Sequence, residues 1–189
     1  MDSPKSMVWW MIPVILGFFM GSIVLQIQTC VPSEVVTVNP DGATGTAFVA
    51  YHAGLSSFQK DVTMAFVRGL VSNGWRCDVT TASREAPMDL SAYDLLVLGA
   101  PTYAFKPANP LRRYLTLAGD LGGLPTVLLV TGAGTTENAA SVLAGYVTDA
   151  NGTTIDVLEL WQAAPSEEVD GLSDAMEIAE RAGESIVLP

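Results

Sequence analysis

DLLVLGAPTYAFKPANPLRRYL, the stretch from Asp94 to Leu115, decides the fold. It opens with the uninterrupted apolar run Leu95 to Gly99, a pattern typical of a strand that is buried on both faces of a sheet. Gly99 and Pro101 end that run and begin a loop. Apolar residues then recur at helical spacing, at Leu111, Tyr114, Leu115 and Ala118. The stretch therefore predicts a buried strand, a loop and an amphipathic helix in succession.

The same alternation extends along most of the chain. Four more short apolar runs predict strands, at Ala47 to Tyr51, Cys77 to Thr81, Val127 to Val130 and Ile155 to Leu160. Amphipathic helical patterns separate them, which makes the connections right-handed crossovers between parallel strands. The predicted fold class is α/β, with a doubly wound five-stranded parallel sheet in one domain over residues 46–189.

The N-terminal segment lacks this alternation of strands and helices. Met7 to Ile27 is a run of 21 residues without a charge, and as a helix it would span about 30 Å, the thickness of a bilayer core. We expect a single-pass membrane anchor over residues 1–29 and a linker over residues 30–45. A cleaved signal peptide is the alternative, although its apolar region is usually shorter and no A-x-A site follows. Lys5 precedes the run and no basic residue follows it until Lys60, so the domain is expected on the non-cytoplasmic side.

Composition narrows the functional classes. Twenty acidic residues stand against nine basic ones, and the net charge of −11 argues against nucleic-acid binding. A single histidine and two distant cysteines do not make a metal site. No G-x-S-x-G elbow is present, so a Ser-His-Asp triad cannot be assembled, and no residue is assigned as catalytic.

In a doubly wound sheet, ligands bind beyond the carboxyl ends of the strands, so three loops form the candidate site. The first combines the start of a helix with two hydroxyls, which suits a phosphate monoester, although Ser is also a common helix cap. Its residues are His52, Ala53, Gly54, Leu55, Ser56, Ser57 and Phe58. His52 either hydrogen-bonds a ligand or only packs and caps.

The second loop offers aromatic side chains beside the cleft and the third offers two glycines. A tyrosine ring in the second loop either stacks on a flat ligand or packs over the sheet edge. That loop comprises Pro101, Thr102, Tyr103, Ala104 and Phe105. The third loop lacks the last glycine of a dinucleotide fingerprint and follows the fourth predicted strand, not the first. It comprises Thr131, Gly132, Ala133 and Gly134.

Two segments carry a resemblance to a known family. DLLVLGAPTYAFKPANPLRRYL and TVLLVTGAG resemble the third strand, the fourth strand and the flavin loops of the flavodoxin family, and the likeness runs from Thr46 to Val187. The resemblance implies a non-covalent FMN cofactor, with electron transfer or a quinone-type reduction as the function. It also implies a redox partner protein or a quinone-like acceptor.

The first loop departs from that family. Flavodoxins typically have S/T-x-T-G-x-T there, whereas this chain has His52 to Ser57, without the central Thr-Gly pair. Two hypotheses follow. The chain is a membrane-anchored FMN protein, or it is a flavodoxin-like module that has lost FMN and serves as a binding or scaffold domain.

Overall fold

The structure is a computed structural model that describes residues 5–162 and 174–188. Within the N-terminal helix, it describes the side chains of residues 11–26 and 28. The parts of the predicted anchor and domain at residues 1–4, 163–173 and 189 lie outside the described residues.

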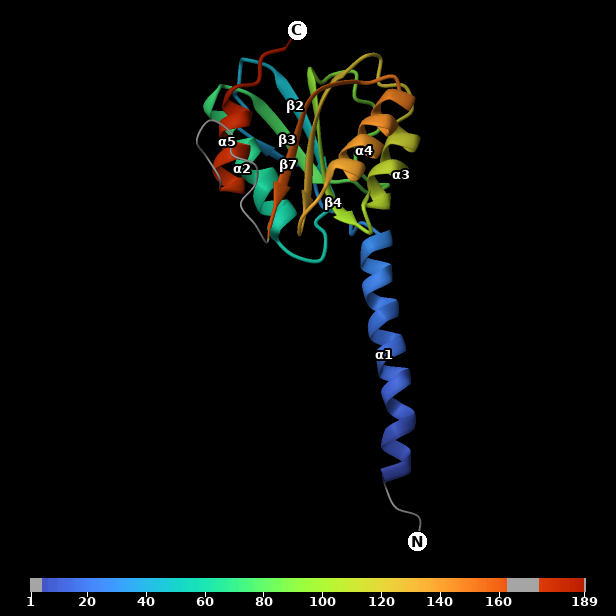
Figure 1. The fold of residues 1–189 in the computed structure, drawn as a ribbon. Helices are drawn as coiled ribbons and strands as arrows, with labels where there is room; N and C mark the ends of the chain where they lie inside the picture. Colours follow the sequence, from blue (N-terminus) through green and yellow to red (C-terminus); the bar gives the residue numbers. More distant parts are fainter. Residues whose placement is uncertain (1–4, 163–173, 189) are drawn as a thin grey trace.

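Figure 1 shows one helix projecting from an α/β domain. In chain order the elements are α1 (Lys5–Gln28), β1 (Val36–Val38), β2 (Thr46–Tyr51), α2 (Phe58–Ser72), β3 (Arg76–Thr81), β4 (Leu95–Tyr103), β5 (Lys106–Pro107), α3 (Asn109–Ala118), β6 (Pro125–Gly132), α4 (Glu137–Asp149), β7 (Thr153–Trp161) and α5 (Ala175–Glu184).

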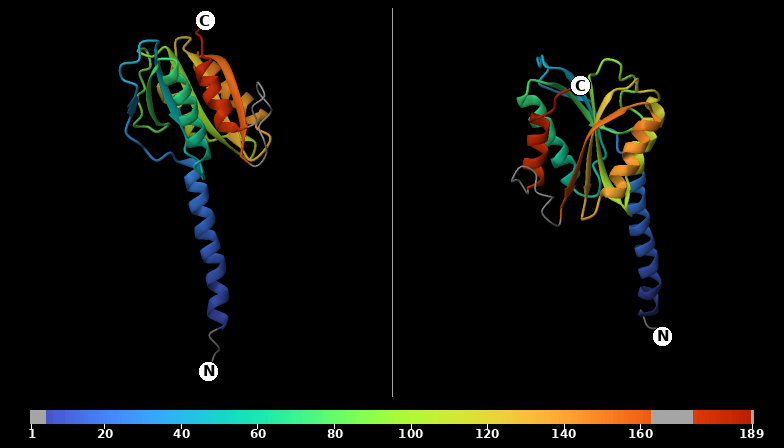
Figure 2. Two further views of the ribbon diagram at one scale, coloured as in Figure 1. Left: turned by 90° about the vertical axis from the view of Figure 1, so that its left-hand side faces the viewer. Right: turned by 45° about the horizontal axis from the view of Figure 1, so that its top comes forward.

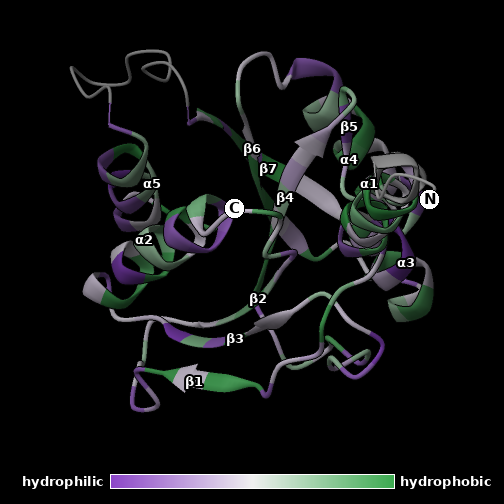
Figure 3. Cartoon of the chain, turned by 90° about the horizontal axis from the view of Figure 1, so that it is seen from below, coloured by the Kyte–Doolittle hydropathy of each residue, from purple (hydrophilic) through white to green (hydrophobic). Residues whose placement is uncertain are grey.

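The sheet is doubly wound, as predicted. Its parallel strands run in the order β3-β2-β4-β6-β7, so the order reverses between β2 and β4. The helices cover both faces: α2 and α5 pack on one side, α3 and α4 on the other (Figures 2 and 3). Two apolar clusters result, one on each face of the sheet, because the central strands are buried on both faces.

The prediction of five strands was wrong, because the sheet has seven. β1 lies within the segment predicted as a linker and pairs antiparallel with β3. β5 folds back antiparallel on β4 through the two-residue turn Ala104–Phe105. Both strands are held by backbone pairing and are only three and two residues long, too short to carry a hydrophobic period.

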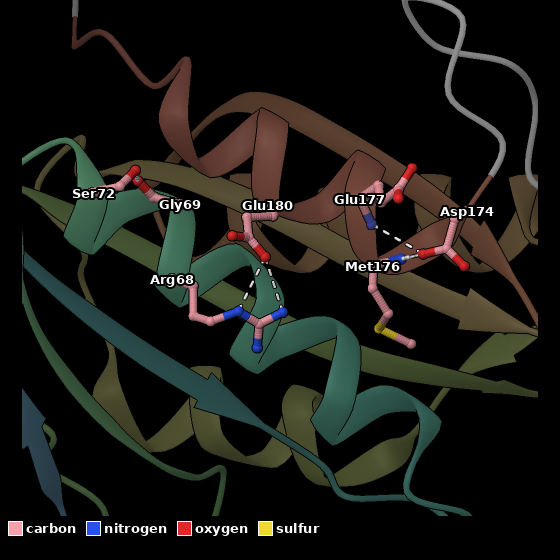
Figure 4. Close-up of polar contacts among 7 residues, drawn as sticks. All are labelled: Arg68, Gly69, Ser72, Asp174, Met176, Glu177 and Glu180. Carbon is pink, nitrogen blue, oxygen red and sulfur yellow. Dashed lines mark hydrogen bonds and ion pairs between the residues drawn. The ribbon is translucent and has the colours of Figure 1, made fainter.

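Helices α2 and α5 approach closely, because glycines face each other across the contact. A Cβ added at Gly69 would collide with the backbone of Glu180, and one at Gly183 would collide with the carbonyl of Phe66. Arg68 joins the same helices at the surface, with Nη2 2.9 Å from Oε2 of Glu180 (Figure 4). These contacts join α2 and α5 into one helical layer.

α1 occupies the segment predicted to cross a membrane. Its 24 residues include Pro13, and it extends from the side of the domain that also carries the loops after β2 and β4 (Figures 1 and 2). Within the part of the chain that the structure describes, no helix combines the length and the hydropathy needed to cross a bilayer. The prediction of a transmembrane helix is therefore not supported by the described residues.

Candidate functional site

The three predicted loops meet at one cleft of about 330 Å³ at the carboxyl ends of β2, β4 and β6. Eleven of the sixteen predicted residues line it: Ala53, Gly54, Leu55, Ser56, Phe58, Pro101, Thr102, Tyr103, Thr131, Gly132 and Ala133. The other five do not: His52, Ser57, Ala104, Phe105 and Gly134. The cleft lies beside the reversal of strand order, where this architecture places its ligands.

The first loop leads into the N-terminus of α2 without a side-chain cap. Ser57 is the N-cap residue, yet its side chain makes no capping hydrogen bond. The capping role that the sequence left open for this serine is therefore not adopted. Free N–H groups at a helix start and the hydroxyls of Ser56 and Ser57, both exposed, remain together at the mouth of the cleft.

Tyr103 reaches across the cleft from the second loop to the first. Its hydroxyl accepts a hydrogen bond of 2.9 Å from the backbone N–H of Leu55. The same hydroxyl lies 3.1 Å from where a Cβ of Gly54 would be, and Gly54 has a φ of +77°. Burial raises the pKa of Tyr103, so the hydroxyl keeps its proton at neutral pH. The tyrosine thus closes one side of the cleft while holding an amide of the first loop.

The tip of the second loop is a strained turn. Ala104 and Phe105 both have positive φ angles, 47° and 63°, a region that non-glycine residues enter at a cost of about 1 kcal/mol or more each. Two such residues between β4 and β5 form a type I′ turn, whose twist matches that of the flanking strands in a tight hairpin. The amide of Asn138 donates to the carbonyl of Phe105, while the Phe105 ring is 70% exposed. An apolar ring is therefore held out in solvent beside the cleft.

The third loop is held by a small, partly buried network. Thr136 donates from Oγ1 to Oε2 of Glu159 at 2.6 Å and accepts from Nε1 of Trp161 at 3.1 Å. A Cβ on Gly132 would lie 2.7 Å from Cγ2 of Thr136, so glycine is required there for close packing. The loop's first glycine therefore has a packing role, and the loop is no dinucleotide fingerprint.

His52 is buried at the end of β2 without a side-chain partner. It is 4% exposed, and among the described residues neither ring nitrogen has a hydrogen-bond partner. Desolvation lowers the pKa of His52, which favours the neutral ring. Because it does not line the cleft, the structure does not bring it to the predicted ligand site.

Two glutamines that line the cleft were not predicted from the sequence. Gln59 is 2% exposed, its Oε1 accepts from Thr131 Oγ1 at 2.7 Å, and its Nε2 donates to Thr63 Oγ1 at 3.2 Å. Gln162 follows β7 and donates its backbone N–H to the carbonyl of Gly132. A glutamine in the first turn of a helix resembles a solvated residue, and its burial depends on a partner 72 positions away. No local pattern marks it.

The chemical groups that line the cleft suit a flavin mononucleotide. Thr102 lines the cleft and its Oγ1 is a buried atom that lacks a hydrogen-bond partner within the described residues, as a ligand contact would leave it. The serine hydroxyls suit a phosphate, and Tyr103 offers a ring. The cleft is at the small end of the range for ligand pockets, about 300 to 1,000 Å³.

Comparison with known proteins supports the fold. A flavodoxin from the domain Archaea aligns with a TM-score of 0.59 at 16% identity, over 74% of this chain and 94% of that one. Megasphaera elsdenii flavodoxin aligns with a TM-score of 0.57 at 15% identity, over 74% and 99%. An NAD(P)H:quinone oxidoreductase from Methanothermobacter marburgensis aligns at 0.51 and 17%, over 75% and 96%. No protein-family model and no curated protein sequence matches the chain. The domain thus has a flavodoxin-like fold, as the sequence predicted.

Proposed function

We propose that the chain is a membrane-attached, flavodoxin-like protein that binds FMN in the cleft and takes part in electron transfer or a flavin-dependent reduction. The observation that carries this proposal is the convergence of all three predicted loops on one cleft at the reversal of strand order. When bound, FMN would supply one- and two-electron redox chemistry, while the protein supplies binding, orientation and electrostatics.

The chain's own groups divide the binding between them. Ser56, which lines the cleft, and the first N–H groups of α2 would hold the phosphate, because a helix start favours an anion; Ser57 lies next to Ser56 outside the lining, and its hydroxyl is not used as a cap. Tyr103 would flank the flavin ring, and the buried hydroxyl of Thr102 would form a hydrogen bond with a polar edge of that ring. His52 lies outside the cleft lining and has no part in this proposal.

Membrane attachment is supported by the surface of α1. Its large apolar side chains are exposed, with Phe18 82% and Phe19 67% exposed. Residues 11–26 contain no charged residue. An exposed apolar patch of this size on a soluble protein would be costly in water, and burial in lipid removes the cost.

The position of the cleft suggests its electron partner. The loops after β2 and β4 lie on the side of the domain from which α1 projects (Figure 1), and the rim there carries exposed Leu55 and Phe105. A bilayer around α1 would face this rim. A lipid-soluble, quinone-like acceptor therefore fits the site better than a hydrophilic redox protein.

The test is flavin binding by the full-length chain in lipid nanodiscs. FMN fluorescence should be quenched on titration, through stacking on Tyr103. The Ser56→Ala/Ser57→Ala variant should weaken FMN more than riboflavin, because only FMN carries the phosphate that these hydroxyls would contact. Ser141→Ala, on the exposed face of α4, is the control and should change neither. A folded wild-type chain that quenches no FMN at high micromolar concentration would rule out the flavin site.

A second candidate is a flavodoxin-like module that binds no FMN. The observation that favours it is the hydroxyl of Tyr103 on the N–H of Leu55, because it already occupies an amide in the loop where a phosphate would bind. In that case the exposed rim residues Leu55 and Phe105 would serve a protein contact. The same titration separates the two candidates.

A further inference from the structure

Three arginines gather where α1 meets the domain. Arg112 and Arg113 lie on α3 and Arg84 follows β3, and together they line a groove of about 390 Å³. All three side chains are exposed, and within the described residues none of them forms an ion pair. Arg112 lies over the ring of Tyr146, 5.7 Å from its centroid. Asp120 and Asp149 line a neighbouring cavity with Arg112, and neither forms an ion pair with it within the described residues. In a chain of net charge −11 with nine basic residues, three arginines on one groove are a concentrated patch of positive charge.

The end of α1 is fastened to this patch. Arg113 donates from Nη1 to the carbonyl of Gln28 at 3.0 Å, and Asn109 donates from Nδ2 to Oε1 of Gln28 at 2.9 Å. A guanidinium at the last carbonyls of a helix satisfies an unpaired acceptor and complements the helix dipole. Figure 1 shows the C-terminal end of α1 at the start of α3, where the two helices are in contact. The groove therefore begins where the exposed apolar surface of α1 ends.

Apolar surface adjoins the charge on both sides of the junction. Leu117 lines the groove and is 50% exposed, and Leu25, less than one helical turn before Gln28, is 62% exposed. A second cavity of about 300 Å³ continues from the groove to the root of α1 and shares Arg84, Arg113 and Leu117 with it. One acidic residue, Glu85, lines this second cavity. Charge and apolar surface thus form one continuous amphipathic site.

This combination selects an amphiphile with an anionic head. Guanidinium groups bind phosphate through paired hydrogen bonds, so the arginines suit a phosphodiester. A soluble phosphate would leave the adjoining apolar surface of α1 and Leu117 uncovered, whereas acyl chains cover it. A choline headgroup brings a positive charge of its own next to the arginines, which disfavours a zwitterionic lipid.

We propose that the groove at the root of α1 binds the headgroup of an anionic phospholipid, with its acyl chains along α1. This inference rests on the membrane attachment proposed above and is independent of FMN. The arginines would fix the height and orientation of the domain on the bilayer and so keep the cleft facing the lipid surface. Juxtamembrane arginines are attracted to anionic leaflets through the same interaction.

The experiment measures lipid selectivity of the full-length chain in nanodiscs. Nanodiscs of phosphatidylcholine with phosphatidylglycerol are dissociated, and native mass spectrometry records which lipid stays bound. The wild-type chain should retain phosphatidylglycerol preferentially. Arg84→Gln/Arg112→Gln should lose about thirtyfold in this preference, and it spares the Arg113 contact that holds α1. Arg68→Gln/Arg181→Gln, which removes the same charge from the opposite helical layer, should keep it.

The outcomes separate this inference from membrane attachment. Equal retention of both lipids by the wild-type chain, or unchanged preference in Arg84→Gln/Arg112→Gln, would overturn the lipid site while attachment stands. Glycerol 3-phosphate that competes as well as short-chain phosphatidylglycerol would also overturn it, in favour of a soluble anion. Failure of the wild-type chain to float with vesicles of either lipid would instead refute attachment. Single variants Arg84→Gln and Arg112→Gln replace the double variant if circular dichroism shows that it is unfolded.

Discussion

Replacing Tyr103 with phenylalanine should tighten FMN binding while destabilising the free domain. The substitution keeps the aromatic ring at the cleft and removes the hydroxyl that accepts the N–H of Leu55. A phosphate that binds the first loop through this N–H must first displace the hydroxyl. The free state then gives up a contact that the bound state does not contain, and removing the contact favours binding.

The magnitude follows from a single hydrogen bond. Its length is 2.9 Å, Tyr103 is half-buried and Leu55 is exposed, so its net contribution is about 1 kcal/mol. Loss of this contact should lower the free energy of unfolding of the ligand-free domain by about that amount. The same difference should lower the Kd for FMN roughly fivefold, since about 1.4 kcal/mol corresponds to a factor of ten.

The assay is a pair of titrations on the full-length chain, one with FMN and one with riboflavin, followed by fluorescence quenching. Riboflavin has no phosphate, so its affinity should be the same in Tyr103→Phe and the wild type. Tyr103→Ala removes the stacking ring as well and should weaken both ligands. Urea unfolding without ligand measures the loss of stability independently.

Equal FMN affinity in Tyr103→Phe and the wild type would refute the idea that Leu55 serves the phosphate. An equal gain for riboflavin would refute it too, because the hydroxyl would then compete with the ring. A loss of FMN affinity would show that the hydroxyl itself contacts the ligand.

Two further predictions concern stability. Gly99→Ala should cost about 1 to 3 kcal/mol in urea unfolding, because its Cβ would lie 2.8 Å from both Gln59 Nε2 and Thr63 Oγ1; Gly145→Ala, with nothing within 4 Å, should instead stabilise by up to about 1 kcal/mol. Similar effects of the two changes would contradict the packing explanation. Burial lowers the pKa of His52 below its ordinary 6.5, so the unfolded chain takes up the proton first as the pH falls. The contribution of neutral, buried His52 to the free energy of unfolding is therefore fully present above about pH 6.5. It declines below that pH, by at most about 1.4 kcal/mol per pH unit, until the lowered pKa is reached. The free energy of unfolding, measured with urea at about pH 7.5 and 5.5, should fall less in His52→Gln than in the wild type. An equal fall in both proteins would show that His52 is not the cause of the pH dependence.

The central strands were predictable because their physics is local. Continuous apolar runs such as Leu95–Leu98 and Val127–Val130 follow from burial on both faces, and all eight residues are fully buried. β7 was predicted from a run interrupted by Asp156 and Glu159, which is what a strand at the sheet edge allows. Its position at the edge could not be read from the run itself.

What the sequence could not reveal depends on partners far along the chain. β1 exists because its backbone pairs with β3, helped by Thr37, whose hydroxyl donates to Asp78 at 2.6 Å. The burial of Gln59 depends on Thr131, and the contact of Tyr103 depends on Leu55. Each of these contacts joins residues about 40 or more positions apart, and composition or periodicity carries no trace of them.

The glycine of the first loop is weak evidence for phosphate binding, because contacts within the chain already explain it. Gly54 is the one glycine of the first loop. Its φ of +77° and the nearness of Tyr103 and Pro101 to its missing Cβ give it a structural reason that needs no ligand. Ser57 makes no capping hydrogen bond at the start of α2, and Thr136 makes none at the start of α4 either. An uncapped helix start is therefore no mark of an anion site in this domain, and the choice between the two candidates is decided by the difference between FMN and riboflavin binding in the Ser56→Ala/Ser57→Ala variant.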